Sequence, residues 1–261
     1  MNFIQEQKLA KQIILKSGRL LKDNFNNFDR SKRYKIKSKT QIQTWIDRAS
    51  EKIILSEIKK QFPDHHFLSE EIGDNQKKSD YFWIIDPLDG TTNYSIHNPL
   101  YGVSIALAYK NKVVLGVTYL PEFDELTIAR AGQGVWLNNK KIHASKIKTL
   151  PKAMLTFCHG SLVNHMKAAI KLYGKFKLRG LDFRQLGSAV CELNFVAQGR
   201  TEAIMIPGAN IYDVAAGALI VKEAGGQVTD FNNQAWTIRS KDILASNSLV
   251  HSRVLKIIKE T

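Results

Sequence analysis

Residues 83–93 read Trp83-Ile84-Ile85-Asp86-Pro87-Leu88-Asp89-Gly90-Thr91-Thr92-Asn93, and the rest of the chain is interpreted outward from this stretch. The apolar residues from Tyr81 to Ile85 predict a strand that ends at the carboxylate of Asp86. Pro87 lacks the N–H that a neighbouring strand would need, and its ring fixes the direction in which the chain leaves. Asp89 follows three residues after Asp86, so both carboxylates can turn toward one point.

The residues after Asp89 suit an anion bound beside a cation. Gly90 lets the backbone approach a ligand closely, and residues 91–93 offer hydroxyls, an amide and free N–H groups. Two hard oxygen donors beside such a turn suit a divalent cation that holds a phosphate. The alternative is a strand followed by an ordinary Asp-Gly hairpin turn. The whole run is more specific than a lone Asp-Gly pair, and it favours the phosphate site.

This segment resembles the signature of the inositol monophosphatase family, whose members are magnesium-dependent, lithium-sensitive phosphomonoesterases. Upstream, Phe67-Leu68-Ser69-Glu70-Glu71 resembles the paired-glutamate motif of that family. Downstream, Ile211-Tyr212-Asp213-Val214-Ala215-Ala216-Gly217 is similar to its Trp-Asp-x-Ala-Ala-Gly motif, with Tyr212 in place of the tryptophan. The resemblance extends from about Ile13 to the last helix. It implies a layered α-β-α-β-α sandwich of the inositol monophosphatase and fructose-1,6-bisphosphatase type.

Length and composition indicate a globular protein. The chain has 261 residues, enough for one large domain or two closely packed halves, and 44% of them are hydrophobic. No apolar run reaches the roughly 20 residues that cross a bilayer, and the N-terminus lacks the basic-then-apolar order of a signal peptide. With no export signal, Cys158 and Cys191 are expected to be buried thiols. We therefore expect a cytoplasmic protein that makes no use of a membrane.

The net charge of +14 would attract anionic substrates, nucleic acid or acidic surfaces. Part of the excess lies in one basic run, made up of Arg30, Lys32, Arg33, Lys35, Lys37 and Lys39. The run is either a solvated hairpin or loop, or a strip that attracts phosphate or contacts RNA. Aromatic residues do not interleave it beyond Tyr34, so stacking on nucleobases has little support.

The first half of the chain predicts two helices and an antiparallel sheet. Residues 2–27 show a broken helical period, and residues 45–62 show a better one. Thr44 can cap the second helix, with Asp47 three residues later in a near capping box. Strand pairs are expected at 102–109 with 113–120, and at 134–137 with 141–143. The two helices would cover this sheet.

After about Lys148 the pattern changes to alternating strands and helices. Strands are expected at 153–157, 178–183 and 203–206, and helices at 162–173, 189–197 and 214–224. Alternation predicts helices on the faces of a partly parallel sheet. We therefore expect an α+β half over residues 1–148, with most of the metal ligands. An α/β half over residues 149–261 would carry the C-terminal ligand and substrate-pocket residues.

Hydrolysis of a phosphomonoester is slow because the dianion repels hydroxide and the alkoxide is a poor leaving group. Divalent cations ease both problems. The resemblance implies two or three Mg²⁺ ions per active site. It places the first magnesium on Glu70, Asp86 and the carbonyl of Leu88. It places the second on Asp86, Asp89 and Asp213.

The resemblance also implies catalytic and substrate-binding roles. Glu70 and Thr91 would orient the attacking water, and Asp47 would support Thr91. The backbone N–H groups of Gly90 and Thr91 would receive the phosphate, and Asp213 would border the substrate as well as the metal. The segment Gly187-Ser188-Ala189 matches a part of the family that lines the substrate pocket.

Several of these residues have a purely structural alternative. Asp47 could simply stabilise the N-terminus of a helix. Glu70 could be a surface acid beside Glu71, and Asp213 could cap the helix that it precedes. Residues 187–189 could be an ordinary helix start. The chain's 7 histidines show no metal-binding spacing and are expected to be ordinary residues.

The chain departs from the family pattern around the substrate. Ile206 stands seven residues before Asp213, where relatives commonly carry an acidic residue that accepts substrate hydroxyls, and isoleucine cannot do so. Gln41-Ile42-Gln43 replaces a more usual Asp-apolar-Val run. We expect magnesium-dependent hydrolysis of inositol 1-phosphate or a related sugar or polyol phosphate. Sister activities on fructose 1,6-bisphosphate, histidinol phosphate, NADP or 3′-phosphoadenosine 5′-phosphate stay open.

A second class of function also stays open. Some bacterial relatives that resemble this chain act in RNA processing or transcription through a basic surface, and the basic run motivates that alternative here. A protein that only binds has no need for Glu70, Asp86, Asp89 and Asp213 together. The resemblance further leads us to expect a homodimer.

Overall fold

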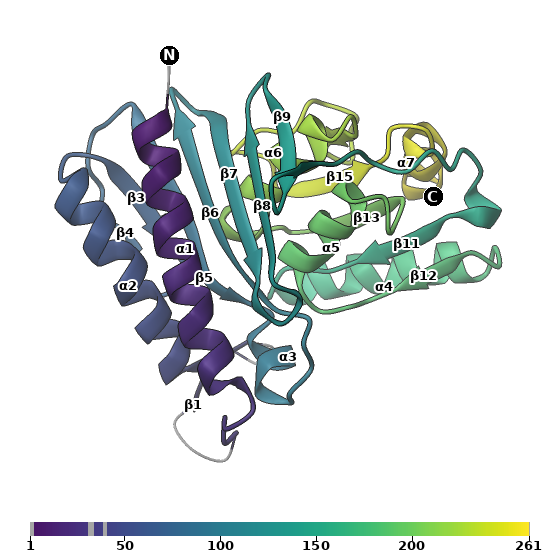
Figure 1. Cartoon of the computed structure of the whole chain (residues 1–261). Helices are drawn as coiled ribbons and strands as arrows, with labels where there is room; N and C mark the ends of the chain where they lie inside the picture. Colours follow the sequence, from purple (N-terminus) through teal and green to yellow (C-terminus); the bar gives the residue numbers. More distant parts are fainter. Residues whose placement is uncertain (1–2, 31–33, 39–40, 261) are drawn as a thin grey trace.

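The computed structural model describes residues 3–30, 34–38 and 41–260. Helices and sheets alternate in five layers, as the family resemblance predicts (Figure 1). Two helices cover the outer face of an eight-stranded sheet, two lie between this sheet and a five-stranded one, and two cover the far face. No helix in the described part of the chain combines the length and apolarity needed to cross a bilayer.

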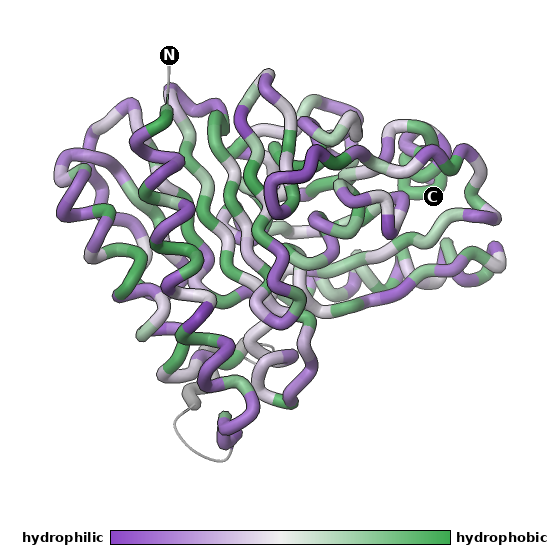
Figure 2. Tube along the Cα trace, in the orientation of Figure 1, coloured by the Kyte–Doolittle hydropathy of each residue, from purple (hydrophilic) through white to green (hydrophobic). Residues whose placement is uncertain are grey.

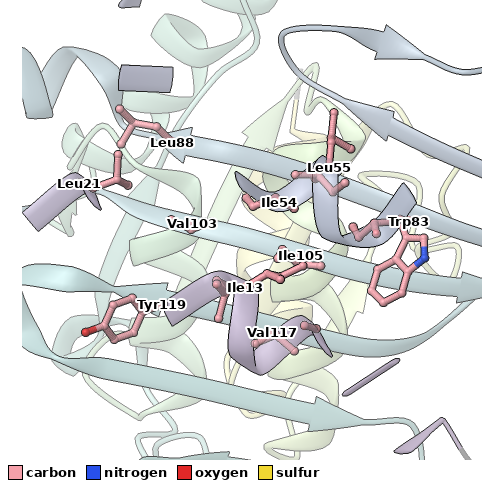
Figure 3. Packing of buried hydrophobic residues seen from close by; sticks show 14 of the residues in the cluster. Ile13, Leu21, Ile54, Leu55, Trp83, Leu88, Val103, Ile105, Val117 and Tyr119 are labelled. Atoms are coloured by element: carbon pink, nitrogen blue, oxygen red, sulfur yellow. The ribbon is translucent and has the colours of Figure 1, made fainter. Parts of the chain in front are cut away.

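The first layer consists of α1 (Ile4–Phe25) and α2 (Trp45–Gln61), close to the predicted ranges. Thr44 caps α2, and Asp47 completes the capping box by accepting from the Thr44 backbone N–H. The apolar faces of both helices pack on the sheet, where Ile13 and Ile54 meet Ile105 and other buried residues (Figure 3). Each buried side chain of this size removes enough apolar surface from water to stabilise the fold by about 1.5–3 kcal/mol.

The first sheet has the strand order β10-β9-β8-β7-β6-β5-β3-β4. Its strands are β3 (His66–Ser69), β4 (Gly73–Asp74), β5 (Tyr81–Asp89), β6 (Gly102–Tyr109), β7 (Lys112–Leu120), β8 (Glu125–Arg130), β9 (Gly134–Leu137) and β10 (Lys140–Lys141). The prediction of a purely antiparallel sheet was wrong, because β3 and β5 pair in parallel. The connection between them is the helix-free segment 70–80, which returns along the sheet through β4.

The central strand β5 also differs from the prediction, because it does not end at Ile85. It continues through Pro87 to Asp89, and its register with β6 shifts between Asp86 and Asp89. Proline cannot donate to a neighbouring strand, so it is tolerated at such an irregularity. The shift bends the strand end, which lets carboxylates three residues apart point into one cavity.

The middle layer consists of α5 (Ala189–Ala197), at the predicted place, and α6 (Ile211–Glu223), which begins three residues before the predicted start at residue 214 and therefore contains Asp213. Helix α6 lies against β5, β6, β7 and β8, and also against α5. Its contact with the sheet is close: a Cβ on Gly116 would lie 2.7 Å from the backbone oxygen of Ala216. Small residues at this contact therefore let α6 pack closely on the sheet, which places Asp213 near the end of β5.

The second sheet has the order β12-β11-β13-β15-β14, with strands at Met154–Phe157 (β11), Asp182–Arg184 (β12), Ala203–Pro207 (β13), Gln227–Thr229 (β14) and Asp242–Ser246 (β15). As predicted, it is partly parallel: β12, β11 and β13 run in parallel, while β15 is antiparallel to β13. The predicted strand over 178–183 was wrong at its start. Helix α4 (Val163–Lys177) ends in a turn through Gly180, so β12 begins only at Asp182.

The outer face of the second sheet is covered by α4 and by α7 (His251–Lys259). The remaining short elements are β1 (Tyr34–Ser38), β2 (Gln41–Thr44) and α3 (Thr91–Ser95), with single 3₁₀ turns at Pro121–Phe123 and Leu150–Lys152. Figure 2 shows hydrophobic residues along much of the strands, and hydrophilic residues recurring along α1 and α2. The core therefore lies between the layers rather than in one centre.

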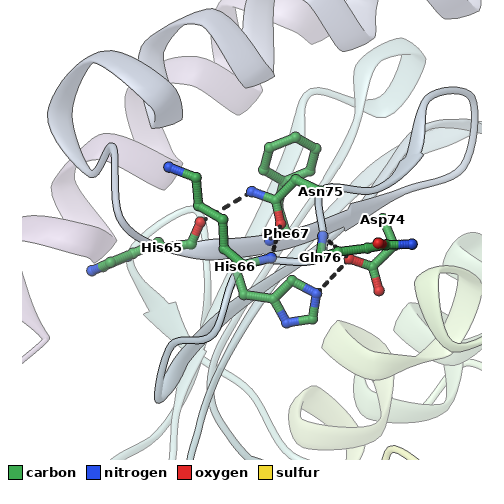
Figure 4. Close-up of polar contacts among 7 residues, drawn as sticks. His65, His66, Phe67, Asp74, Asn75 and Gln76 are labelled. Carbon is green, nitrogen blue, oxygen red and sulfur yellow. Dashed lines mark hydrogen bonds and ion pairs between the residues drawn. The ribbon is translucent and has the colours of Figure 1, made fainter.

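The turn between β3 and β4, which carries Glu70, is fastened at its base by side chains (Figure 4). Asn75 accepts from the N–H of Phe67 at 3.0 Å and donates to the carbonyl of His65 at 3.2 Å. His66 Nε2 lies 2.7 Å from Asp74 Oδ1 across the same pair of strands. These contacts fix where the turn leaves the sheet.

Candidate active site

A cavity of about 470 Å³ opens where the end of β5, the turn after β3, α5 and α6 meet. Its walls come from both halves of the sequence, which the first sheet and the middle helices bring together. The lining residues are Ile42, Glu70, Asp86, Leu88, Asp89, Gly90, Thr91, Thr92, Asn93, Cys158, His159, Met166, Gln185, Gly187, Ala189, Ile206, Asn210 and Asp213. Of the residues predicted from the sequence, only Asp47 and Ser188 do not line it, and both contact residues that do.

Four carboxylates from three different elements meet in this cavity. Glu70 follows β3, Asp86 and Asp89 lie on β5, and Asp213 lies in the first turn of α6. Burial raises the pKa of Asp86 well above its usual range, and the charges of Glu70, Asp89 and Asp213 raise it further. Burial likewise raises the pKa of Asp213, with Asp89 and Glu70 adding to the shift. The four groups therefore act as one cluster of mutually repelling acids.

The donor chemistry of this cluster fits a hard divalent cation, which prefers carboxylate oxygens. Among the described residues, no three His, Cys, Asp or Glu side chains stand ready in the geometry of a metal site. Asp86 instead shares hydrogen bonds with Glu70 and with Asp213. Acids that share protons in this way satisfy one another, and a cation would replace those protons. The chemistry of these oxygen donors fits magnesium. Their spacing in this structure is that of acids that hydrogen-bond to one another.

Asp89 is held by the start of α5. The Ser188 hydroxyl and the N–H of Val190 both donate to Asp89 Oδ2, the second over 2.8 Å. Burial raises the pKa of Asp89 to about 6, and these donors limit the rise because they favour the charged form. Ser188 also caps α5 by accepting from the N–H of Cys191. The predicted pocket segment is therefore both a helix start and a clamp on Asp89.

Thr91 is positioned by Asp47, as the resemblance implies. The Thr91 hydroxyl lies 2.9 Å from Asp47 Oδ1 and 3.1 Å from the carbonyl oxygen of Leu88. Asp47 also stabilises the start of α2 as part of its capping box, so the same side chain supports a helix and contacts Thr91. Burial raises the pKa of Asp47 to about 6.

Gly90 has a φ of +82°, and a Cβ there would lie 2.8 Å from the carbonyl of Leu100, so glycine is required.

The alternative that Asp213 caps α6 was wrong. The residue at the cap is Asn210, and Asp213 is the third residue of the helix, within its first turn. Asn210 instead donates to Asp213 Oδ2 over 3.1 Å. Asp213 is therefore oriented by the cap residue and is directed into the cavity.

The sequence analysis missed a buried acid behind the pocket. Glu192 is fully buried in α5, and its Oε1 accepts from the N–H groups of Leu186 and Gly187, each over 3.1 Å, and from the Cys158 thiol over 2.9 Å. Burial raises the pKa of Glu192 to about 7. The position of Glu192 in the helical period does not distinguish it from an acid on the protein surface. As expected, Cys158 and Cys191 are buried free thiols.

The cavity is also lined by residues to which the sequence assigned no role, among them His159, Met166 and Gln185. Ile206 is buried and lines the cavity too, so it presents an apolar surface there. The Gln43 side chain donates to Glu71, which links β2 to the turn that carries Glu70.

The basic run lies only partly within the described residues. Lys35 and Lys37 belong to β1, which pairs with β2. Ile42, on β2, lines the cavity, so the hairpin backbone runs beside the site. Lys32, Arg33 and Lys39 lie outside the described residues. The expectation that this run contacts phosphate or RNA therefore stays a prediction.

Comparison with known proteins points to one family. The model of the inositol monophosphatase family matches residues 5–261. A Thermotoga maritima protein named fructose-1,6-bisphosphatase/inositol-1-monophosphatase is 34% identical over 252 residues, which is 95% of this chain and 94% of that protein. The Escherichia coli K12 protein named Nus factor SuhB is 33% identical over 254 residues, covering 97% and 95% of the two chains.

Solved structures give the same result. The extragenic suppressor protein SuhB of Bartonella henselae superposes with a TM-score of 0.90 at 31% identity, over 98% of this chain and 99% of that one. The Thermotoga maritima inositol monophosphatase superposes with a TM-score of 0.86 at 33% identity, over 97% and 96%. The five-layer arrangement is therefore shared along almost the whole length.

The raised pKa values predict that Asp86→Asn stabilises the metal-free protein. An acid whose pKa is raised on folding, as from 3.8 to about 6 for Asp89, makes the folded state hold more protons than the unfolded chain. The free energy of unfolding then falls as pH rises through that interval. In EDTA at pH 7.5, Asp86→Asn should raise the free energy of unfolding, because it removes a carboxylate whose pKa is raised by burial and by the charges of Glu70, Asp89 and Asp213.

Urea denaturation monitored by circular dichroism measures this change. The gain should shrink as pH falls, because acids with a raised pKa take up protons in the folded wild type before they do in the unfolded chain. Asp64→Asn, at an exposed position, is the matched control and should change little. An unfolding free energy that falls on Asp86→Asn at pH 7.5 would show that the cluster is not under electrostatic strain.

Proposed function

Because the chain belongs to the inositol monophosphatase family, we propose that it hydrolyses a small phosphomonoester with Mg²⁺ as its cofactor. The observation that carries this proposal is the meeting of four carboxylates from three elements in one cavity, with Asp86 buried and Glu70, Asp89 and Asp213 half-buried. The substrate class is inositol 1-phosphate or a related sugar or polyol phosphate. The predicted homodimer and cytoplasmic location stay predictions.

The proposed ligands divide between two positions. Glu70, Asp86 and the Leu88 carbonyl would hold the first ion, and Asp86, Asp89 and Asp213 the second. When bound, such ions neutralise phosphate oxygens, acidify a water and stabilise the leaving alkoxide. Their binding is favoured by the repulsion among the carboxylates, because each cation removes a charge conflict that the metal-free protein relieves only by taking up protons.

The chain's own groups would orient the water and the phosphate. The Thr91 hydroxyl, held by Asp47 over 2.9 Å, can accept a hydrogen bond from a water that Glu70 also contacts. Gly90 and Thr91 line the cavity, and we propose that their backbone N–H groups donate to phosphate oxygens, although the Gly90 N–H donates to Asp89 in this structure. Positioning of this kind makes a large contribution to phosphoryl transfer, since the protein itself forms no covalent bond.

The apolar wall at Ile206 would broaden the choice of substrate. A site with a buried acceptor rejects compounds that lack the matching hydroxyl, whereas an apolar wall discriminates by only about 1–3 kcal/mol per methylene-sized difference. Inositol 1-phosphate, fructose 1,6-bisphosphate, histidinol phosphate, NADP and 3′-phosphoadenosine 5′-phosphate therefore all remain candidate substrates.

The alternative function is an RNA- or transcription-associated role on the same fold. It is supported by relatives that bear the name Nus factor SuhB and by the net charge of +14. The retained carboxylate cluster favours the phosphatase, because a protein that only binds does not need four strained acids. The two roles are compatible, since the basic hairpin and the carboxylates are different parts of the chain.

Asp86→Asn should abolish most of the activity. Asp86 is proposed to contact both ions, so the change removes charge from both positions with little change in volume. We expect kcat to fall by at least about 10³-fold, which corresponds to about 4 kcal/mol of transition-state stabilisation. Phosphate release from a panel of phosphomonoesters, with Mg²⁺ and with EDTA, measures the effect. A variant that keeps tens of per cent of wild-type activity under saturating Mg²⁺ would remove the two-ion assignment.

Ile206 predicts weak discrimination among substrates. We expect kcat/KM for inositol 1-phosphate to lie close to the values for fructose 1,6-bisphosphate, histidinol phosphate, glycerol 2-phosphate and NADP. Ile206→Glu should raise the preference for inositol 1-phosphate, because it restores an acceptor for hydroxyls. A wild type that prefers inositol 1-phosphate by more than about 100-fold over every other compound, or about 2.7 kcal/mol, would show that Ile206 does not broaden the choice of substrate.

A further inference from the structure

Glu51 is a buried acid that lies outside the cavity and belongs to none of the three family motifs. It is on the inward face of α2 and is only 1% exposed. Burying a carboxylate is costly unless donors satisfy it. The partners of Glu51 therefore indicate what the residue is for.

Within the described residues, the hydrogen-bond donors to Glu51 all come from the turn that carries Glu70. Its Oε1 accepts from the hydroxyl of Ser69 and from the N–H groups of Glu71 and Ile72, each of the latter over 3.1 Å. These donors flank Glu70 on both sides in the sequence. One carboxylate oxygen thus holds the side chain of the residue immediately before a proposed metal ligand and the backbone N–H groups of the two residues after it.

The other contacts of the turn hold different atoms: the Gln43 side chain donates to the carboxylate of Glu71, whereas Glu51 accepts from the backbone N–H groups of Glu71 and Ile72. The N–H of Glu70 donates to the carbonyl of Ile85 over 3.2 Å, which fixes one edge of the turn to β5. The contacts of Asn75 and Asp74 fasten only its base (Figure 4). At the tip, the side chain of Ile72 is 62% exposed, so packing does not hold it.

A hollow of about 390 Å³ lies beside the tip, between it and α2, and is lined in part by Arg48, Lys52 and Ile72. The turn therefore has space to shift if its hydrogen bonds to Glu51 are lost. A tightly packed turn would keep its shape without them, whereas this one depends on the carboxylate.

We propose that Glu51 is a positioning residue, which fixes the turn over residues 69–72 so that the Glu70 carboxylate is directed at Asp86 and can bind Mg²⁺ there. The inference rests on the proposed function, because it assigns Glu70 to the first ion. Glu51 does not touch the substrate or the ion. It acts by holding the backbone from which the ligand extends, and its removal should weaken metal binding more than it slows the loaded enzyme.

The test measures Mg²⁺ binding by isothermal titration calorimetry, without substrate, for the wild type, Glu51→Ala and Glu51→Gln. Loss of a group that orients a ligand typically costs 10–100-fold in metal affinity, so Glu51→Ala should raise the Kd of the tighter site by at least about 10-fold. Glu51→Gln should fall between it and the wild type, because a neutral amide oxygen still accepts but forms weaker bonds than a carboxylate.

The kinetic readout separates positioning from catalysis. In Glu51→Ala the Mg²⁺ concentration for half-maximal phosphate release should rise with the Kd, while kcat at saturating Mg²⁺ should recover most of its wild-type value. Glu57→Ala is the matched control, because it removes the same charge from the same helix and, in the described part of the chain, Glu57 forms no hydrogen bond with the turn. It should leave both quantities unchanged.

Ser69→Ala provides a second route, because it deletes one donor and leaves the acid in place. If Glu51→Ala does not fold, Glu51→Gln and Ser69→Ala decide the matter, and both should weaken Mg²⁺ binding. Folded Glu51 variants with wild-type Mg²⁺ affinity would overturn the positioning role alone. A wild type that binds no Mg²⁺ would overturn the proposed function together with it.

Discussion

The electrostatic repulsion among four carboxylates gathered in one cavity is the constraint on which the rest of the structure depends. Burial and like charges both raise the pKa of Asp86 and Asp213, so a folded chain that keeps these acids together does so at a cost in stability. The two sheets and the helices around them form the scaffold that compensates for this loss of stability. The cluster lies where β5 ends between two helical layers, which lets residues more than a hundred positions apart meet at one cavity.

The scaffold holds these acids mainly through hydrogen bonds from neighbouring turns and helix starts. The first turn of α5 binds Asp89, the cap residue of α6 binds Asp213, and the capping box of α2 binds Asp47. In each case the donors favour the charged form and direct the side chain. The residues that orient these acids belong to helix starts, so the site takes shape as those helices form.

Much of this arrangement could be predicted from the sequence, and the misses have physical reasons. The three motifs and the helical periods correctly indicated the five-layer fold and the elements that carry Glu70, Asp86 and Asp213. The strand through Pro87 was missed because local sequence does not reveal a register shift that depends on β6. Strand β8 was missed, as were β14 and β15, because short strands carry little periodic signal. Glu51 and Glu192 were missed because a buried acid looks like a surface acid until its backbone donors, far away in the sequence, are located.

The most direct test of the account is a crystal structure of the protein grown with Mn²⁺, a divalent cation that can replace Mg²⁺ and is visible by its anomalous scattering. The account predicts anomalous peaks between the carboxylates of Glu70, Asp86, Asp89 and Asp213, with Asp86 contacting two of them. It also predicts that the hydrogen bonds of Asp86 to Glu70 and Asp213 are replaced by bonds to the ions. A well-ordered cavity without anomalous density at saturating Mn²⁺, with the acids still hydrogen-bonded to one another, would contradict it.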